Sequence, residues 1–141
     1  QRPTLALEQF QEIIKPALKA GKVVISDRYA DSTLAYQGYG RGISKEFVRR
    51  ANGIATDKVT PDLTIVLDIP VRTGLERAEA CKGSRDRLES EGLEFHGKVR
   101  KGYLEIAKKE PGRVKVIRVT SIGETWERIR KAVDSLLERK A

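Results

Sequence analysis

The stretch Val23-Val-Ile-Ser-Asp-Arg-Tyr-Ala-Asp-Ser-Thr-Leu-Ala-Tyr-Gln37 decides how this chain is interpreted. Its first part, within Lys22–Ser26, is β-branched and apolar and predicts a buried parallel strand. Ligands bind at the carboxyl ends of strands in open α/β sheets, where this run delivers Asp27 and Arg28. A carboxylate suits a hydrated Mg²⁺, and a planar guanidinium binds phosphate bidentately. The pair therefore indicates phosphoryl chemistry.

An Asp-Arg pair alone is more often a helix cap with a surface ion pair. Here it is followed by Tyr36-Gln-Gly-Tyr-Gly-Arg-Gly42, which gathers two aromatic rings, an amide, a second arginine and three glycines in one loop. Glycines allow close approach of the backbone to a ligand, and aromatic rings pack on planar groups. This composition favours a site for a planar ring and an anion.

The length of 141 residues predicts a single domain over 1–141. The sequence contains no apolar run of the ~20 residues that a membrane span needs, and no secretory signal is visible. Cys81 and His96 are the single cysteine and histidine, which excludes an internal disulfide, a cysteine-only zinc site and a His-rich metal cluster. Cytoplasmic residence is the default expectation, with no membrane partner.

The net charge of +8 raises the question of nucleic-acid binding. Residues 108–141 hold ten Lys/Arg and five Asp/Glu, so they carry +5 of that charge. They are predicted to form a strand and an amphipathic helix whose charges make a solvated face. They also lack the interleaved aromatic residues of single-strand binders. We therefore expect no specific nucleic-acid partner.

Periodicity and turn signals predict an alternation of helices and strands. The expected helices are one that kinks at Pro16 and ends at Gly21, one from Ser44 to 57, one over Val71–Lys82, one over about 89–109, and a closing helix after the capping box Ser121–Glu124. The expected strands are Lys22–Ser26, Leu63–Asp68 and Arg113–Val119, and Lys82–Arg87 is expected to be a loop.

The apolar positions of these helices predict which faces are buried. In the second helix the expected inward residues are Phe47, Val48, Ala51, Ile54 and Ala55. In the closing helix they are Ile122, Trp126, Ile129, Val133, Leu136 and Leu137. Short linkers between alternating elements predict an α/β fold, a three-layer parallel sheet with helices on both faces. Three strands are few for this architecture, so either the sheet is small or part of the domain is absent.

Several motifs together resemble the bacterial-type thymidylate kinases over nearly the whole chain, from about residue 5 to 140. The matching segments are Asp27-Arg28-Tyr29, Ser32, Ala35-Tyr36-Gln37-Gly38, Gly40-Arg41-Gly42, Pro61-Asp62-Leu63, Leu67-Asp68 and Asp86-Arg87-Leu88-Glu89. The resemblance implies a P-loop nucleoside monophosphate kinase fold. It also implies transfer of the γ-phosphoryl group of ATP to dTMP, which gives dTDP for dTTP biosynthesis.

The resemblance assigns roles to the matched positions of the acceptor side. Asp27 would hold Mg²⁺ through water, and Arg28 would bind the acceptor phosphate and align it with the donor. Ser32, Tyr36 and Gln37 would line the nucleoside pocket, with Tyr36 placed against the sugar to disfavour a 2′-hydroxyl.

On the donor side, the resemblance places Arg85 and Arg87 in a lid that supplies arginine to the phosphates. Without the other motifs, a solvated charged loop is the simpler interpretation of these two residues. The resemblance also places Thr120, Ser121 and Ile122 near the adenine of ATP. Arginines of this kind stabilise the charge that spreads over the moving phosphoryl group, and each commonly contributes on the order of 10³-fold in rate.

Two features depart from the family pattern. No Gly-x-x-x-x-Gly-Lys-Ser/Thr sequence occurs in the 141 residues, so the backbone cradle and the lysine for the β- and γ-phosphates are missing. In the family this element precedes the matched region, and its strand lies between the strands expected at 22–26 and 63–68. The simplest interpretation is a chain that begins past the P-loop. Arg118 also stands where the family usually has aspartate.

The leading hypothesis is thus the acceptor-nucleotide and lid portion of a dTMP kinase. We expect the 141-residue chain alone not to phosphorylate dTMP. One alternative is another nucleoside monophosphate kinase, which shares the Asp-Arg chemistry but does not need Tyr36 and Gln37. Another is a non-catalytic binding or dimerisation module with the same fold. Family members pair as homodimers through helices, and the helix at 44–57 is the candidate contact.

Overall fold

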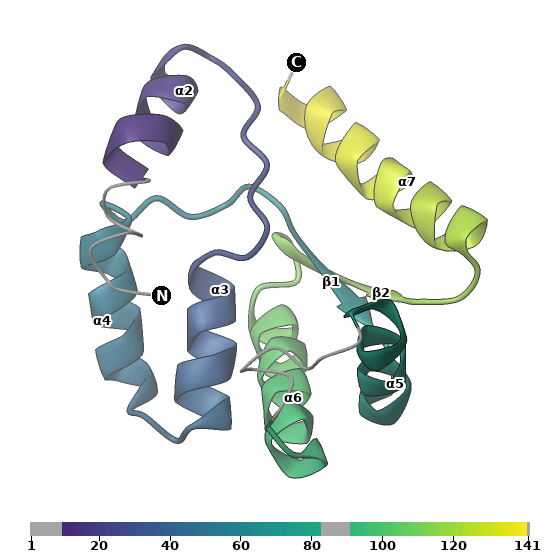
Figure 1. Ribbon diagram of the computed structural model, residues 1–141. Helices are drawn as coiled ribbons and strands as arrows, with labels where there is room; N and C mark the ends of the chain where they lie inside the picture. Colours follow the sequence, from purple (N-terminus) through teal and green to yellow (C-terminus); the bar gives the residue numbers. More distant parts are fainter. Residues whose placement is uncertain (1–9, 83–90, 141) are drawn as a thin grey trace.

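The computed structural model describes residues 10–82 and 91–140. A chain of short helices leads into two strands and three longer helices (Figure 1). In chain order the elements are η1 (Phe10–Ile14), α2 (Lys15–Lys19), α3 (Ala30–Thr33), η2 (Leu34–Gly40), α4 (Lys45–Ala55), β1 (Thr64–Asp68), α5 (Val71–Lys82), α6 (Leu93–Lys109), β2 (Val114–Arg118) and α7 (Ile122–Lys140). Both η segments are π-helical. Within the described ranges, no helix combines the length and apolar character needed to cross a bilayer.

The sheet consists of β1 and β2, which pair in parallel with Thr64 opposite Val114 and Asp68 opposite Arg118. Both strands are rich in β-branched residues, as expected for buried parallel strands. The chain between them passes through α5 and α6, because parallel neighbours need a long crossover connection. The strands predicted at 63–68 and 113–119 are therefore confirmed within a residue or two, and so is the parallel α/β character of the fold.

The expected strand at Lys22–Ser26 is wrong for this structure. Residues 22–26 have no regular secondary structure, and Val23 and Ile25 are 76% and 93% exposed. A strand requires a neighbour that satisfies its backbone N–H and C=O groups, and within the described residues only β1 and β2 form a sheet. The β propensity of this run therefore finds no partner.

The core forms where η2 packs against α6. Its buried side chains come from four elements that are distant in sequence, and they are Leu34, Ala35, Val48, Val99, Ile106, Ala107 and Val114. Gly40 and Gly102 make the close approach possible. A Cβ at Gly102 would lie 2.7 Å from the Tyr39 ring, and one at Gly40 would lie 2.8 Å from Phe95. The predicted apolar side of α6, with Phe95, Val99, Tyr103 and Ile106, is confirmed as the side that faces this core.

Helix α4 begins as predicted, because Ser44 Oγ accepts a hydrogen bond from the Phe47 amide at 3.3 Å. Its burial differs from the prediction. Val48 is buried and Ala55 is half-buried, but Phe47, Ala51 and Ile54 are exposed, Phe47 by 65% and Ile54 by 78%. The helix contacts η2 and α3 along a stripe narrower than its apolar face, so part of that face remains in solvent.

Helix α5 spans Val71–Lys82 as predicted, directly after Pro70. The closing helix α7 also begins after Ser121 as predicted, but the burial expected for it is wrong for three of its six apolar residues. Ile122 is 92% exposed and Trp126 and Leu137 are exposed, whereas Ile129, Val133 and Leu136 are half-buried. A two-stranded sheet offers less surface than this apolar face needs, since α7 packs against β2 and lies apart from the other helices (Figure 1).

The first helix is interrupted near Pro16, as predicted, and the structure resolves the interruption into π-helical η1 followed by α2. Proline has no N–H to continue the hydrogen-bond ladder, which accounts for the change of register. The chain turns at Gly21, whose φ of +70° suits glycine. The start expected for this helix and the loop expected at 83–87 lie outside the described residues. The helix expected from about 89 begins later than predicted, at Leu93, because residues 91 and 92 are not helical.

Candidate active site

Arg28 and Tyr36 lie face to face at the start of the acceptor segment, by which we mean residues 27–42. The Arg28 guanidinium carbon is 5.1 Å from the centroid of the Tyr36 ring, within the range of a cation–π interaction. Arg28 has a φ of 67°, and its carbonyl accepts a hydrogen bond from Ser26 Oγ at 2.8 Å. A left-handed conformation is unfavourable for arginine, so the turn imposes a strained backbone on this residue. Such strain is frequent at functional sites.

The contact continues from Tyr36 into α6. The rings of Tyr36 and Phe95 meet edge to face, with centroids 6.0 Å apart, and the guanidinium of Arg41 lies 5.7 Å from the centroid of Phe95. Arg41 also contacts Glu91 at 3.3 Å. Two exposed arginines thus lie on either side of an aromatic pair that joins η2 to α6. The sequence indicated Arg28 and Tyr36, but the helical spacing of Phe95 predicts only a core residue.

Ser32 is buried and lies against Tyr103 of α6. Burial raises the pKa of the Tyr103 phenol, and a hydrogen bond with Ser32 lowers the pKa by less. The phenol is therefore protonated at neutral pH and can serve as a hydrogen-bond donor or acceptor. Ser32 was predicted to contact the nucleoside. In this structure Ser32 lies beside Tyr103 of α6, and its contact with a nucleoside stays a prediction.

Gln37 is half-buried, and its backbone carbonyl accepts a hydrogen bond from the Ile43 amide at 3.0 Å. The glycines that follow are needed for this turn. A Cβ at Gly38 would lie 3.1 Å from Leu34, and Gly42 has a φ of +73°. The loop predicted at 36–42 is therefore wrong for residues 36–40, which belong to the π-helical η2, and the chain leaves the helix only at Arg41.

Asp27 precedes Arg28 and is exposed. Within residues 10–82 and 91–140, no three or more His, Cys, Asp or Glu side chains gather into a possible metal cluster. A single exposed carboxylate fits Mg²⁺, which keeps several waters and takes other ligands from substrate phosphates. The residues present therefore fit the water-mediated contact that the sequence suggested for Asp27.

The residues predicted to lie near adenine line an apolar cavity of about 270 Å³ beside α7. The predicted Thr120, Ser121 and Ile122 contribute to it, and the remaining lining residues are Leu67, Arg77, Val119, Thr125, Trp126 and Ile129. The loop is fixed by a hydrogen bond from the Thr120 amide to Thr125 Oγ1 at 3.1 Å, and by one from the Glu124 amide to Ser121 Oγ at 3.3 Å. Arg77 and Trp126 were not among the predicted site residues, because both belong to helical patterns that give no sign of a cavity.

An ion pair between Asp68 and Arg100 connects α6 with the end of β1. Arg100 donates through Nε and Nη2 to the two carboxylate oxygens of Asp68 at 2.6 and 2.9 Å. The hydrogen bond from Arg100 lowers the pKa of Asp68, and the charges of Arg100 and Arg118 act in the same direction. Asp68 follows Leu67, which lines the cavity, and Arg100 lies on the helix that carries Phe95 and Tyr103. The pair thus lies on elements that contribute to both candidate sites.

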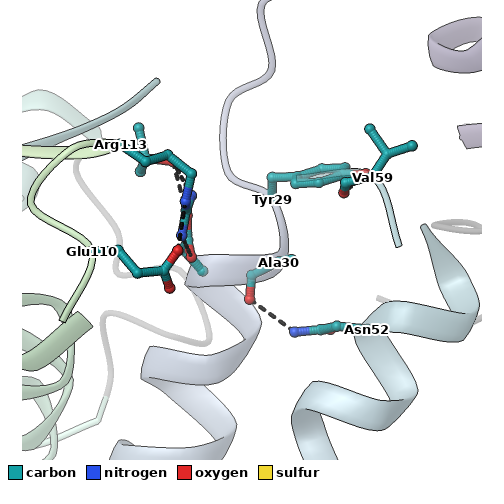
Figure 2. A network of polar contacts seen from close by, with 8 residues as sticks. Tyr29, Ala30, Asn52, Val59, Glu110 and Arg113 are labelled. Atoms are coloured by element: carbon teal, nitrogen blue, oxygen red, sulfur yellow. Dashed lines mark hydrogen bonds and ion pairs between the residues drawn. The ribbon is translucent and has the colours of Figure 1, made fainter. Parts of the chain in front are cut away.

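A second bidentate ion pair joins α3 to the residue before β2. Arg113 donates to Asp31 through Nη1 at 2.7 Å and Nη2 at 2.9 Å, and Thr64 Oγ1 donates to the same carboxylate at 2.8 Å. Figure 2 shows this network beside the hydrogen bond from Asn52 to the Ala30 carbonyl, which links α4 to α3. Nothing in the sequence pattern singled out Asp31 or Arg113. Their pairing across the fold became visible only in three dimensions.

The predicted lid arginines Arg85 and Arg87 lie outside the described residues, so their roles stay predictions. The described site therefore consists of the acceptor segment with Phe95 and Tyr103 of α6, and the separate cavity around Thr120–Ile122. Arg118, at the end of β2, accepts a hydrogen bond from Arg128 through its carbonyl at 3.2 Å, and its exposed side chain lies outside the cavity lining.

Comparison with known proteins identifies the family. The model of the family described as thymidylate kinase matches residues 5–129. The chain belongs to the thymidylate kinase family. Among curated thymidylate kinases, that of Desulfovibrio desulfuricans is 46% identical over 140 residues, covering 94% of this chain and 64% of the relative. That of Sulfurihydrogenibium sp. is 50% identical over 130 residues, covering 92% and 61%.

A solved structure agrees with this family membership. The crystal structure of thymidylate kinase from Ehrlichia chaffeensis is 34% identical, covers 93% of this chain and 59% of that chain, and superposes with a TM-score of 0.68. The expected P-loop nucleoside monophosphate kinase fold is thereby confirmed. This family member spans about three fifths of the length of the relatives it matches.

Proposed function

We propose that this chain forms the acceptor-nucleotide and lid portion of a dTMP kinase, which transfers the γ-phosphoryl group of ATP to dTMP and gives dTDP. The observation that carries the proposal is the contact of Arg28 with Tyr36 at 5.1 Å. It brings a phosphate-binding cation and a flat ring together on the segment whose motifs match the family. A nucleoside monophosphate offers an anion and a sugar-base unit to those two groups.

Arg28 has the charge and planar geometry to bind the acceptor phosphate through two parallel hydrogen bonds. Neutralising that phosphate favours approach of the negatively charged donor, and holding it fixes the line of attack. Tyr36 would lie against the sugar, where its ring leaves no room for a 2′-hydroxyl. Gln37, with an amide that both donates and accepts, would contact the base.

ATP is the proposed phosphate donor, with its adenine in the cavity that Thr120, Ser121 and Ile122 line. Mg²⁺ would bridge the donor phosphates and neutralise the charge that develops there, and Asp27 would hold it through water. Arg85 and Arg87 are proposed, from the motif alone, to bind the transferred phosphoryl group. Since ATP and dTMP are cytoplasmic nucleotides, the proposed location is the cytoplasm.

A homodimer is also proposed, through the exposed apolar stripe of α4. Phe47, Ala51 and Ile54 lie four and three residues apart and therefore share one side of the helix. Contiguous exposed apolar surface of this kind is typical of an interaction site. A second copy of the same helix would cover the stripe in a two-fold symmetric contact.

The proposal is tested by nucleotide binding, because the sequence has no Gly-x-x-x-x-Gly-Lys-Ser/Thr motif and we expect no turnover from these 141 residues. Isothermal titration calorimetry with dTMP, dUMP, UMP and dGMP should show preference for dTMP, with UMP weaker by tenfold or more, roughly the effect of a steric clash in a fitted pocket. The Tyr36→Ala variant should lose most of the discrimination against UMP.

Tyr36→Phe serves as the matched control, since it keeps the ring and should keep the preference. Equal affinity of the unmodified chain for UMP and dTMP would favour a different nucleoside monophosphate kinase. Absence of binding for all four nucleotides would favour a non-catalytic module. Robust turnover with ATP, Mg²⁺ and dTMP would instead show that a donor-phosphate site exists elsewhere in the chain.

A further inference from the structure

The ion pair between Asp31 and Arg113 joins two parts of the chain that are 82 residues apart in sequence. Arg113 uses both terminal nitrogens on both oxygens of Asp31, at 2.7 and 2.9 Å. Thr64 completes a closed arrangement, because its hydroxyl accepts from Arg113 Nη1 at 3.0 Å and donates to Asp31 at 2.8 Å. The backbone also ties Thr64 to Arg113, through an N–H to carbonyl bond of 2.9 Å. The first turn of α3 is therefore fastened to the start of both strands.

This pair differs in burial from the other ion pairs of the described residues. The side chains of Arg113 and Asp31 are 16% and 13% exposed, whereas in each of the others at least one partner is 45% exposed or more. A planar, bidentate pair with its remaining hydrogen bonds satisfied is the arrangement in which charges best offset the cost of burial. Arg113 also donates through Nε to the carboxylate of Glu110 at 2.9 Å, a contact that Figure 2 shows.

Helix α3 needs such an anchor, because the segment before it contributes a single, neutral long-range hydrogen bond among the described residues, from the Tyr29 hydroxyl to the Val59 carbonyl at 3.3 Å. Residues 22–26 form no strand, and α3 itself has four residues, Ala30–Thr33. Its position is fixed by polar contacts on three sides. They are Asp31 to the sheet, Ser32 to Tyr103 of α6, and Ala30 to Asn52 of α4. Of these, the contact of Asp31 is the one that includes two charges and three hydrogen bonds to the same carboxylate.

Arg28 depends on this anchor through a short piece of backbone. Two residues separate Arg28 from Asp31, and Arg28 already has a strained φ of 67°. A shift of the first turn of α3 therefore changes where the guanidinium of Arg28 lies over Tyr36. The hydrophobic contacts of Leu34 and Ala35 hold η2 on α6 further along, so they keep the helix packed without fixing the turn that carries Arg28.

We propose that Asp31 and Arg113 are positioning residues, whose ion pair, closed by Thr64, holds Arg28 and Tyr36 in the arrangement that receives the acceptor phosphate. This inference rests on the proposed function for its ligand, a nucleoside monophosphate. Asp31 and Arg113 act through Arg28 and do not themselves touch the substrate.

The test compares Arg113→Lys, which keeps the charge but loses the bidentate geometry, with Asp31→Asn and the double variant Asp31→Asn/Arg113→Gln. We expect each single variant to weaken dTMP binding about tenfold, a typical cost of displacing a positioned group by a fraction of an ångström to an ångström. The double variant should bind dTMP about as tightly as either single variant. The two losses should therefore not add as they would for independent sites, because both residues act as one unit.

The matched control is Asp57→Asn, which removes the exposed ion pair with Lys15 and should leave dTMP affinity unchanged. If Asp31→Asn does not fold, Arg113→Lys and Thr64→Val test the same arrangement with smaller changes. Unchanged dTMP affinity in a folded Arg113→Lys variant with a lowered melting temperature would overturn the proposal, since the pair would then be merely structural. An equal loss in Asp57→Asn would overturn it as well.

A second measurement separates this inference from the proposed function. Tyrosine-ring ¹³C NMR of the chain without ligand reports the contact of Arg28 with Tyr36 directly. Arg113→Lys should shift the Tyr36 ring signals and leave those of Tyr39 in place. If dTMP does not bind to the unmodified chain, the proposed function fails while the Tyr36 shift still supports the positioning role. Unshifted Tyr36 signals in Arg113→Lys would overturn that role whatever the ligand.

Discussion

The Arg28 guanidinium lies over the ring of Tyr36, 5.1 Å from its centroid, and the backbone of Arg28 is left-handed at φ 67°. Arg28 lies in the turn before α3 and Tyr36 lies in η2, so a strained turn is what brings the cation back over the ring. An arginine held in this way is already ordered before a phosphate arrives. Less side-chain entropy is then lost on binding than for a freely moving arginine.

Two substitutions of Arg28 distinguish the contribution of its charge to binding from the effect of its backbone strain on stability. Arg28→Ala and Arg28→Gly should both weaken dTMP binding about 10- to 100-fold, since a hydrogen-bonded charge contributes about 1.5–3 kcal/mol. Because φ is positive here, Arg28→Gly should be more stable than Arg28→Ala by about 1 kcal/mol. Calorimetry with dTMP and urea unfolding measure the two effects. Equal stability of the two variants would contradict the strain seen at this residue.

Trp126, the single tryptophan of the chain, reports on the cavity beside α7. Its side chain lines the cavity and is exposed, so a bound adenine should cover the indole and move its fluorescence emission to shorter wavelength. Titration with ATP checks this, and dTMP alone should leave the emission unchanged because the acceptor segment is elsewhere. Binding of ATP seen by calorimetry without any change in emission would place the adenine outside this cavity.

Two glycines of α6 provide a matched pair for the packing of this helix. Gly102→Ala places a methyl group 2.7 Å from the Tyr39 ring and should destabilise the fold by about 1–3 kcal/mol, the usual cost of overpacking. Gly97 has no atom within 4 Å of the added Cβ, so Gly97→Ala should stabilise the helix by up to about 1 kcal/mol. Urea unfolding of both variants checks the difference. Equal changes in the free energy of unfolding would show that the Tyr39 ring moves aside without destabilising the fold.

The apolar stripe of α4 predicts the oligomeric state. Phe47→Asp and Ile54→Asp should each convert a dimer into monomers, because a charge placed in an apolar contact must be desolvated without a partner. Arg49→Asp introduces the same charge away from the stripe and should leave the dimer intact. Sedimentation velocity at several protein concentrations measures the three variants. A monomeric unmodified chain, or a dimer that survives Phe47→Asp, would contradict the proposed contact.

The pair of Asp31 and Arg113 predicts a specific pH dependence of stability. Burial raises the pKa of Asp31, but hydrogen bonds from Arg113 and Thr64 outweigh burial and lower the pKa below its ordinary value. The stabilisation is therefore present above the unfolded-state pKa of about 3.9 and is lost as the pH falls through the lower pKa of the folded state. Asp31→Asn should thus be less stable by about 2–3 kcal/mol at pH 7.

This stability gap should shrink below about pH 4, where Asp31 of the unmodified chain begins to take up a proton in the unfolded state. Urea unfolding of the two proteins between pH 3 and 7 checks the trend. The contributions of all other carboxylates cancel in the difference, because both proteins contain them. Asp62→Asn, which removes an exposed pair with Lys140, should change stability by less than about 1 kcal/mol. A gap that stays constant down to pH 3 would contradict the prediction.

Much of the local structure could be predicted from the sequence. The Ser44 cap, the start of α5 after Pro70, and the apolar side of α6 all depend on residues within a few positions of one another. The acceptor segment was also found from its sequence, because Arg28 and Tyr36 lie close together in the chain. The prediction of burial was wrong for Phe47, Ile54, Ile122 and Trp126. Amphipathicity shows which face of a helix is apolar but not whether another element covers that face.

The sequence by itself determined the helices outside α3 and η2, the two paired strands, and the residue types that a phosphate and a nucleoside require, because these depend on short-range periodicity, capping and side-chain chemistry. The helical form of α3 and η2 was not predicted, since the glycine-rich run at 36–42 indicated a loop. Only the tertiary structure decided that residues 22–26 form no strand and that Asp31 pairs with Arg113. Both outcomes are long-range. A strand exists only beside a partner that satisfies its backbone, and an ion pair across 82 residues leaves no local pattern.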